Sequence, residues 1–371
     1  MITIVLFLIL LIYSVSVGLL IFGFTKVNTI DYIDLKPKTA FTIIVPFRDE
    51  AENLPILLES LSKLQYPEEL VDVILVDDES EEKRTTPLSY RAQSRYAIQI
   101  IKNVRITNSP KKDAITTAMQ TIHTDWIVTT DADCTFHENW LLTLDNYIQI
   151  HPVSMLAGAV TYACENSFLH HFQQLDLASL QGATIGSFGI NKGFMCNGAN
   201  FAYTKSFFQE LNGYAGNDEI ASGDDVFLLQ KAVSHFPEKV QYLKSHNTIV
   251  VTKPLNNWRS LFHQRVRWAS KTGSYQSTFG KGLSVLVFMA NLALVLAFGF
   301  LFLGLISFQN LFLLFALKFS IDSVLIHKTN RFLTQNKMRY LISSSVFYPF
   351  FSTSVALYSL FGKYEWKGRK F

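Results

Sequence analysis

Hydrophobic stretches lie near both ends of the chain. Residues 2–24 contain no charged side chain, and hydrophobic runs return at residues 283–306, 311–326 and 341–361. Because a helix needs roughly 20 apolar residues to cross the hydrocarbon core of a bilayer, these runs are candidate membrane segments. The pattern predicts an N-terminal transmembrane anchor over residues 1–25, a transmembrane hairpin over residues 283–327 and a third C-terminal hydrophobic segment over residues 341–361.

Basic residues beside these segments predict how they are oriented. Lys26, Lys36 and Lys38 follow the first segment, and the cytosolic flanks of membrane helices are enriched in lysine and arginine. A signal peptide would instead have a basic region before the apolar run and a small-residue cleavage site after it. We therefore expect a retained anchor with a cytosolic C-terminal side. A basic linker over residues 328–340 should also be cytosolic; it contains Lys328, Arg331, Lys337 and Arg339.

The last hydrophobic segment allows two arrangements. Its length suffices for a full crossing, but that would place a basic tail over residues 362–371, with Lys363, Lys367, Arg369 and Lys370, outside the cell. Pro349 lies in the middle of the segment, where it removes a helical hydrogen bond. We expect a broken, re-entrant or interfacial segment and a cytosolic tail, with Tyr364 and Trp366 as interface anchors.

Two ionisable residues interrupt the second half of the hairpin. Lys318 and Asp322 are four residues apart and therefore share one helical face. Charges at membrane depth are costly and usually face a partner or a cavity. We expect the two to pair towards the protein interior, either as a purely structural pair or at the border of a site for a lipid acceptor.

The middle of the chain alternates short β-branched runs with helical patterns. Strands are predicted over residues 42–46, 71–76, 98–101 and 126–130, and helices over residues 54–64 and 114–122. This alternation is typical of βαβ units in an α/β domain with a mostly parallel, Rossmann-like sheet, here over residues 38–256. Acidic clusters follow two of the strands, at the sheet edge where ligands bind in such domains.

Composition narrows the class of protein. Of 371 residues 49% are hydrophobic and 17% are charged, below the roughly 25% usual in soluble domains. The formal net charge of +3 argues against a nucleic-acid binder that relies on a basic surface. Cys134, Cys164 and Cys196 form no CxxC pair, so the sequence indicates neither a zinc cluster nor a disulfide framework.

Asp131 and Asp133 are the first candidate site residues. If the backbone stays extended after the strand, both carboxylates point to the same side. Such a pair could hold Mg²⁺ or Mn²⁺, which would neutralise a bound diphosphate. The alternative is a solvated turn, because aspartate is common in turns.

Other polar positions also have two interpretations. Asp78 could accept a hydrogen bond from a uracil N–H or a ribose hydroxyl, or cap a turn. Lys111 and Lys112 could face a phosphate or belong to a solvated helix face. Asp224 and Asp225 could supply a general base, or they could favour a helix start capped by Ser222.

A helix over residues 257–281 brings three different side chains onto one face. Gln264, Arg267 and Trp268 fall at i, i+3 and i+4. Arginine suits bidentate phosphate contact, and a tryptophan face is a common sugar platform. Trp258 and Phe262 would also fit an amphipathic helix at the membrane interface.

The order of these motifs resembles the membrane-associated family 2 glycosyltransferases, which include cellulose, chitin and hyaluronan synthases and ceramide glucosyltransferase. The resemblance covers residues 41–276. It rests on the segments 45–50 (VPFRDE), 77–80 (DDES), 131–133 (DAD), 197–200 (NGAN), 223–225 (GDD) and 264–268 (QRVRW), with Lys111 before Ala114. It implies an A-type glycosyltransferase fold.

The resemblance also implies roles for single residues. Donor binding would involve Pro46, Arg48, Glu50, Asp78, Lys111, Asp131 and Asp133, with the last two also holding Mg²⁺ or Mn²⁺. Asp225 would be the catalytic base, with Asp224 as the alternative, and Arg267 would neutralise the leaving diphosphate. Asn200, Gln264 and Trp268 would meet the acceptor. The segment 167–193 would shape the acceptor site, although its composition also suits an ordinary core.

The expected protein is an inverting, metal-dependent transferase at the cytosolic face of a bacterial inner membrane. It would move a sugar from a nucleotide donor, UDP-linked by analogy, to a hydroxyl of a lipid-linked acceptor. A processive polysaccharide synthase is the first alternative, but the small membrane part offers little room for a polymer channel. A non-catalytic membrane scaffold and a nucleotidyltransferase are the others.

Overall fold

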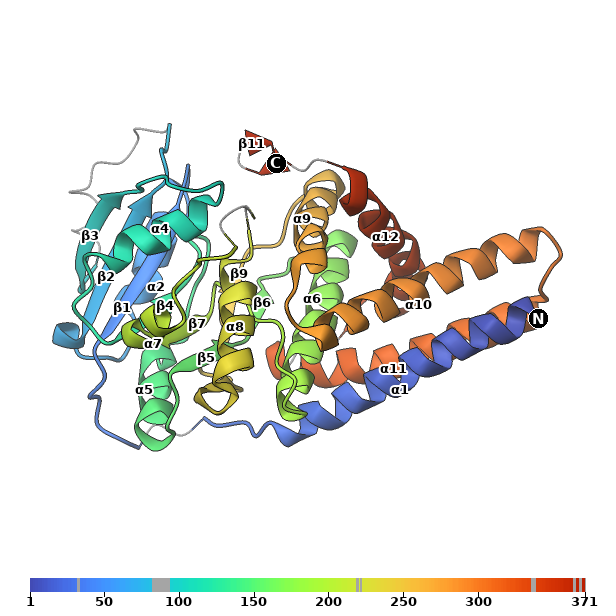
Figure 1. The fold of residues 1–371 in the computed structure, drawn as a ribbon, viewed down its shortest axis with the longest axis horizontal. Coiled ribbons are helices and arrows are strands. Elements are labelled where there is room, and N and C mark those ends of the chain that lie inside the picture. Colours follow the sequence, from blue (N-terminus) through green and yellow to red (C-terminus); the bar gives the residue numbers. More distant parts are fainter. Residues whose placement is uncertain are drawn as a thin grey trace. The chain divides into compact units, whose positions relative to one another are not determined.

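The computed structural model describes residues 1–31, 34–81, 94–217, 220, 222–334 and 338–362, and the backbone of 365–366 and 369–370. The chain folds into two compact units (Figure 1). The sheet unit contains residues 28–163 and 195–253, and the helical unit contains residues 1–27, 164–194 and 254–371.

A seven-stranded sheet with the order β3-β2-β1-β4-β7-β5-β8 organises the sheet unit. Its strands are β1 (Phe41–Phe47), β2 (Val71–Asp77), β3 (Ala97–Lys102), β4 (Trp126–Thr129), β5 (Met155–Gly158), β7 (Phe201–Thr204) and β8 (Val240–Leu243). Only β7 runs antiparallel to its neighbours among these strands. A second, two-stranded sheet pairs β6 (Val160–Tyr162) with β9 (Val250–Thr252). The expected mostly parallel α/β sheet is therefore confirmed.

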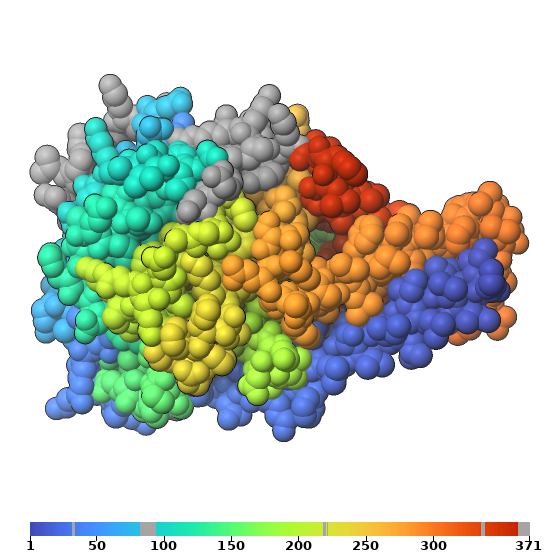
Figure 2. Space-filling model, viewed as in Figure 1, coloured from blue at the N-terminus to red at the C-terminus, as the bar shows by residue number. Residues whose placement is uncertain are grey.

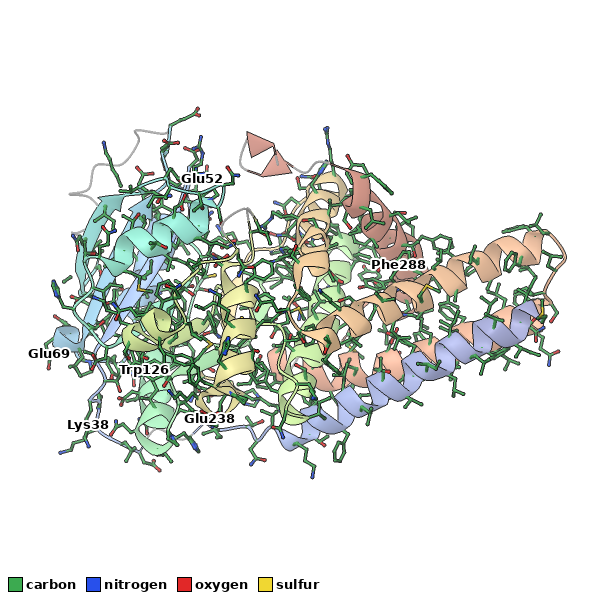
Figure 3. All side chains as sticks on the ribbon, viewed as in Figure 1. Lys38, Glu52, Glu69, Trp126, Glu238 and Phe288 are labelled. Carbon is green, nitrogen blue, oxygen red and sulfur yellow. The ribbon has the colours of Figure 1, made fainter. Side chains whose placement is uncertain are left out.

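Helices and apolar side chains cover this sheet. The helical elements are α2 (Leu54–Ser62), η1 (Glu68–Leu70), α4 (Pro110–Met119), α5 (Trp140–Ile150), α7 (Lys205–Glu210), α8 (Asp224–His235) and η2 (Pro237–Lys239). Val45, Leu57 and Trp140 are fully buried in the core, and Trp126, labelled in Figure 3, is almost fully buried at the start of β4. Because β1, β2 and β4 are parallel, the loops after them meet at one sheet edge.

Pro46 lies on β1 where only one neighbour pairs with the strand. In β1, residues 41–44 pair with β4, whereas Pro46 lies opposite Val76 of β2. A proline lacks the N–H that a second partner would need, so it fits a position beyond the end of β4. Pro46 thus shapes the end of the strand that leads into the first candidate loop.

The helical unit contains α1 (Ile2–Lys26), α6 (Phe168–Gly189), α9 (Trp258–Ser270), η3 (Thr272–Ser274), α10 (Thr278–Phe302), α11 (Phe308–Leu333), α12 (Leu341–Phe361) and the hairpin β10 (Glu365–Trp366) and β11 (Arg369–Lys370). Among the described residues, the four helices α1, α10, α11 and α12 are long and apolar enough to cross a membrane. Figure 2 shows α1 in blue beside the orange α10–α11 hairpin, whose outer surface exposes large apolar side chains such as Phe302 and Phe312.

Several boundaries differ from the expectations. Helix α11 continues through Lys328 and Arg331, so the basic linker is shorter than residues 328–340; Lys337 lies outside the described residues. Within segment 167–193, residues Phe168–Gly189 form α6, which belongs to the helical unit rather than to the sheet unit. Its buried side chains pack against α1 and α11, a contact that local periodicity does not reveal.

The expected break at Pro349 is wrong, because α12 is one continuous helix from Leu341 to Phe361. Proline removes a single helical hydrogen bond. Residues beyond it pack firmly: Phe350 contacts Phe298 of α10, and Phe351 contacts Phe262 of α9. This packing outweighs the lost bond. Lys363, Tyr364, Lys367 and Gly368 lie outside the described residues, as does the Trp366 side chain.

Glycines allow α1 and α6 to touch through their backbones. A Cβ added to Gly189 of α6 would lie 1.8 Å from the carbonyl oxygen of Gly23 in α1, and one added to Gly186 would lie 2.3 Å from that of Leu20. Small residues permit such close helix crossings, particularly where lipid surrounds the helices.

Gly189→Val should therefore disrupt this crossing. We expect a lower apparent melting temperature of the purified protein, corresponding to roughly 1–3 kcal/mol of overpacking. Gly18→Val is the matched control, because Gly18 is also on α1 and a Cβ there would meet no atom within 4 Å. Equal melting temperatures for the two variants would contradict the close approach.

Candidate functional site

The loops after β1 and β2 are fastened to each other at the edge of the sheet. Asp49 and Glu79 both adopt left-handed backbone conformations, with φ of 52° and 61°. The Asp49 amide donates to the Ser80 hydroxyl at 3.0 Å, and the Glu81 amide donates to Asp49 Oδ1 at 2.8 Å. Non-glycine residues in this region are strained and are often found at functional sites.

Arg48 and Glu50, two expected donor contacts, also hold these loops. The Arg48 guanidinium donates to the Asp78 carbonyl at 3.1 Å and lies 3.3 Å from the Glu81 carboxylate. Glu50 accepts a hydrogen bond from the Asn53 side chain just before α2. Arg48 therefore fixes the loop that carries Asp78.

The carboxylate of Asp78 is buried and already oriented. The Asn103 amide donates to Asp78 Oδ1 at 2.7 Å, and the Arg105 guanidinium lies 3.5 Å from the same oxygen. Asn103 and Arg105 follow β3 and were not among the sequence candidates. Asp113 holds their loop by accepting from Arg105 Nε and from the Thr107 amide. A conspicuous motif does not mark these residues, and only the sheet order brings them to Asp78.

Lys111 links the two acidic motifs in the sheet unit. Its Nζ donates to Asp131 Oδ1 at 2.7 Å and lies 3.5 Å from Asp224 Oδ2. Burial alone would lower the pKa of the Lys111 ammonium. The negative charges of Asp131 and Asp224 have the larger combined effect, so the pKa is raised. Lys111 is therefore positively charged at neutral pH. Its two contacts bring Asp131 and Asp224 close to each other.

Gly198 lies where these groups converge. The Gly198 amide donates to Asp225 Oδ2 at 2.8 Å, and the Thr129 hydroxyl donates to the Gly198 carbonyl at 2.8 Å. A Cβ on Gly198 would lie 3.0 Å from both Asp224 Oδ2 and Lys111 Nζ. The absence of a side chain thus lets the strand end approach both carboxylates closely.

Asp224 and Asp225 have different surroundings at the start of α8. Asp224 is buried against Lys111, whereas Asp225 is partly exposed. The residue that precedes α8 is Gly223 at φ 88°, and it provides no side-chain cap, so the alternative that Ser222 caps this helix is wrong. A left-handed residue here suits glycine and directs both carboxylates into the first turn.

Asp133 is held by a residue distant in sequence. The Thr252 hydroxyl of β9 donates to Asp133 Oδ2 at 2.9 Å. Burial and the nearby Asp131 charge raise the pKa of Asp133. The backbone turns after β4, with the Cys134 amide donating to the Asp131 carbonyl, so the expected extended backbone is wrong. The turn, rather than strand alternation, keeps the two carboxylates near each other.

Asp131 and Asp133 could supply part of the coordination shell of a divalent cation. Two neighbouring carboxylates, Asp131 and Asp133, carry a mutual repulsion that a cation would relieve. Among the described residues there is no group of three His, Cys, Asp or Glu that could enclose a metal. Mg²⁺ commonly takes one or two protein carboxylates and completes its shell with phosphate oxygens and water.

The structure does not place Asn200 at an acceptor. Its side chain is buried, and Nδ2 donates to the carbonyls of Ala159 and Thr248 at 2.8 and 2.7 Å. Its Oδ1 accepts from Trp140 Nε1 at 3.3 Å. The Asn200 amide therefore makes its hydrogen bonds inside the core, which corrects the expected contact with an acceptor.

Lys112 also differs from the expected solvated face. It is 1% exposed, and its Nζ donates to the carbonyls of Asn217 and Ile220 at 2.6 and 2.9 Å. It also lies over the Phe227 ring of α8, 5.2 Å from the centroid. Lys112 thus ties Asn217 and Ile220, which precede Asp224 and Asp225 in the chain, to α4.

Gln264, Arg267 and Trp268 lie on α9 in the helical unit, as the helical spacing predicts. The unexpected residue is Arg265, which is buried, donates to Gln264 and lies 4.2 Å from the Trp268 ring centroid. Trp258 and Phe262 pack against Phe351 of α12. Those two aromatic rings therefore face a neighbouring helix.

The expected pair inside α11 is present. Lys318 Nζ donates to Asp322 Oδ2 at 2.6 Å, and the Tyr13 hydroxyl of α1 donates to Asp322 Oδ1 at 2.6 Å. The three side chains form one network that joins the two helices and gives each charge a partner.

The sheet order and the acidic loops at its edge define an A-type glycosyltransferase fold. The profile of Glycosyl transferase family 2 matches residues 42–211. The matched region is therefore a family 2 glycosyltransferase domain, whereas the segments 223–225 and 264–268 of the motif resemblance lie beyond it. No curated protein sequence matched the chain.

Three solved structures are similar to this chain, and the first of them supports the fold. The mannosyltransferase PcManGT from Pyrobaculum calidifontis, in complex with GDP-Man and Mn²⁺, aligns with a TM-score of 0.57 at 17% identity, over 91% of this chain and 99% of that one. S. aureus TarS 1-349 with UDP-GlcNAc aligns at 0.44 and 11% identity, over 90% and 96%. M. tuberculosis glucosyl-3-phosphoglycerate synthase aligns at 0.42 and 14%, over 62% and 78%.

Proposed function

We propose that the protein transfers one sugar from a nucleoside-diphosphate donor to a hydroxyl group of a membrane lipid, with inversion at the anomeric carbon. The observation that carries this proposal is the cluster of Lys111, Asp131, Asp224 and Asp225 around Gly198. It combines a charged ammonium with a partly exposed carboxylate. One inverting displacement needs these two functions: a stabilised leaving group and a base.

Asp225 is the general base in this proposal. Its carboxylate takes the proton of the acceptor hydroxyl while that oxygen attacks the anomeric carbon. The bond from this carbon to the diphosphate breaks on the opposite face, and its electrons leave with the nucleoside diphosphate. The Gly198 amide holds Oδ2 of Asp225 in place during the proton transfer.

The donor lies along the loops after β1, β2 and β4. Asp78 accepts from the nucleoside, and Lys111 faces the diphosphate charge. Asp131 and Asp133 hold Mg²⁺ or Mn²⁺, which supplies further neutralisation of the diphosphate when it is bound. The structure of PcManGT contains GDP-Man and Mn²⁺, which supports a nucleotide-sugar donor. Gln264, Arg267 and Trp268 keep the acceptor and leaving-group roles that the family resemblance implies.

Membrane association follows from the apolar helices. We propose that α1, α10 and α11 cross a bacterial inner membrane and that the catalytic domain is cytosolic. Helix α12 lies along α9 through the Phe262–Tyr358 contact, and β10 also contacts α9. This packing favours an interfacial α12 with the tail on the side of α9.

Membranes that contain the protein should convert one labelled nucleotide sugar into one labelled lipid. The membranes are incubated with a panel of labelled UDP- and GDP-linked sugars and Mg²⁺ or Mn²⁺. The lipid extract is then separated by chromatography and identified by mass spectrometry. Membranes with the Asp225→Asn variant are the control. A labelled polymer, or labelling that is equal in the control, would overturn the proposal.

A further inference from the structure

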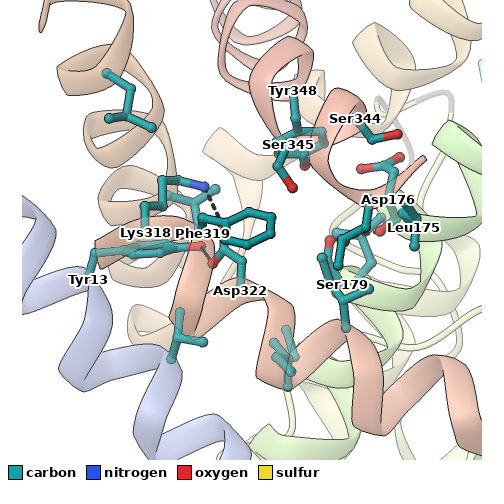
Figure 4. A pocket seen from close by; sticks show the side chains of 18 of the residues that line it. Tyr13, Leu175, Asp176, Ser179, Lys318, Phe319, Asp322, Ser344, Ser345 and Tyr348 are labelled. Carbon is teal, nitrogen blue, oxygen red and sulfur yellow. Dashed lines mark hydrogen bonds and ion pairs between the residues drawn. The ribbon is translucent and has the colours of Figure 1, made fainter. Parts of the chain in front are cut away.

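A cavity inside the helical unit lies between α1, α6, α10, α11 and α12. Its volume is about 120 Å³, and its lining is mainly apolar, with polar side chains at two places. Figure 4 shows the Tyr13–Lys318–Asp322 network on one side and Asp176, Ser344 and Tyr348 on the other. A cavity of this kind, apolar with a few convergent polar groups, is the usual form of a small-ligand site.

The first polar group carries no excess positive charge. Lys318 is paired with Asp322, and the Tyr13 hydroxyl donates to the same carboxylate. The Lys318 ammonium also lies 5.0 Å from the centroid of the Tyr13 ring. An anionic ligand would therefore meet an ammonium that a carboxylate already neutralises.

The second polar group is compensated in the same way. The Arg265 guanidinium of α9 donates to Asp176 Oδ2 at 2.5 Å, and both side chains are buried. Arg265 stacks on Trp268, so Asp176 connects the cavity lining with the QxxRW helix. The charged side chains that line the cavity, Asp176, Lys318 and Asp322, are therefore each paired with an opposite charge, which leaves little to attract a phosphate.

Ser344 gives the cavity an unused hydrogen-bonding group. Its side chain is 4% exposed and lines the cavity, and its Oγ has no hydrogen-bond partner within the described part of the chain. Leaving a buried hydroxyl unpaired is costly, so such a group indicates a ligand or water that completes it. A ligand with its own hydroxyl could both donate to and accept from Ser344.

We propose that this cavity binds the polar end of an uncharged, hydroxyl-bearing lipid of the acylglycerol type, which is the acceptor class for the proposed transfer and so rests on that function. A cavity of about 120 Å³ suits a compact polar end better than a bulky headgroup. A lipid-linked sugar diphosphate is larger and anionic. Because the charges at the cavity are already paired and the cavity is small, binding of such a diphosphate is disfavoured.

Photolabelling tests the site without any donor sugar. The probe is a dioleoylglycerol analogue with a diazirine on one acyl chain, in nanodiscs with the full chain. We expect label on peptides from α6, α11 or α12, and competition by unlabelled dioleoylglycerol. Dioleoylphosphatidic acid and undecaprenyl phosphate should compete at least ten times less well.

Two variants and their controls make the result specific. Ser179→Phe fills the cavity and should reduce labelling at least ten-fold, whereas Ser354→Phe, on the exposed face of α12, should not. Ser344→Ala should weaken labelling by roughly three- to ten-fold, because it removes one hydrogen bond to the ligand. This variant also tests the site if Ser179→Phe does not fold. Melting temperatures report the fold of each variant.

The outcomes separate this inference from the proposed transfer. Asp225→Asn should keep full labelling, because it removes a base and leaves the cavity intact. Labelling that survives Ser179→Phe, or that undecaprenyl phosphate blocks as well as dioleoylglycerol does, would overturn the lipid site. Specific labelling without any sugar transfer would leave the site standing and refute the transfer alone.

Discussion

Asp225→Asn should lower sugar transfer by roughly 100- to 10,000-fold, the contribution usual for a positioned general base. The asparagine keeps the shape of the side chain, and its oxygen can still accept the Gly198 amide. Binding of the nucleotide sugar should therefore remain close to that of the wild type. Transfer rates and calorimetric affinities, measured on the same purified protein, check both halves of this result.

Asp224→Asn is the matched control for this experiment. Asp224 is buried and lies 3.5 Å from the Lys111 ammonium, so its replacement should weaken the cluster and reduce activity less. If Asp224→Asn were inactive while Asp225→Asn still transferred sugar, the assignment of the base would have to be reversed.

Asp133→Ala should remove the metal-dependent part of donor binding. We expect the affinity for the nucleotide sugar to fall by more than about 100-fold in the presence of Mn²⁺, because the variant loses a metal-binding carboxylate. Titration of the donor with and without Mn²⁺ measures this effect. An unchanged affinity that still responded to Mn²⁺ would show that Asp133 holds no metal.

Thr252→Val provides a graded comparison. The Thr252 hydroxyl orients Asp133 by donating to Oδ2, so this variant keeps the carboxylate and loses only its support. A loss of roughly ten-fold in affinity is usual for partners of metal ligands. Equal losses in Asp133→Ala and Thr252→Val would indicate a disturbed loop instead of a lost ligand.

Local sequence patterns predicted the parts of the fold that depend on short-range chemistry. The buried β-branched runs that became β1, β2 and β4, and the acidic residues at their ends, were located to within a residue or two. Long apolar helices were equally clear. In each of these cases, the periodicity of a single segment determines its structure.

Contacts between distant segments could not be predicted in this way. Asn103 and Arg105 reach Asp78 because the seven-stranded sheet places β3 beside β2, and Thr252 reaches Asp133 from β9 of the two-stranded sheet. Asn200 belongs to a motif that the family resemblance associates with the acceptor, yet its amide bonds inside the core. Arg265 lies between the named positions of QxxRW, and its ion-pair partner Asp176 belongs to the neighbouring helix α6.

The structure of the product tests the central claim most directly. The purified protein, an α-linked nucleotide sugar labelled with ¹³C and the acceptor lipid should yield a lipid with a single sugar. NMR should show a β-linkage to a lipid hydroxyl, as one displacement assisted by Asp225 requires. An α-linkage, a chain of sugars, or free sugar as the sole product would contradict the account.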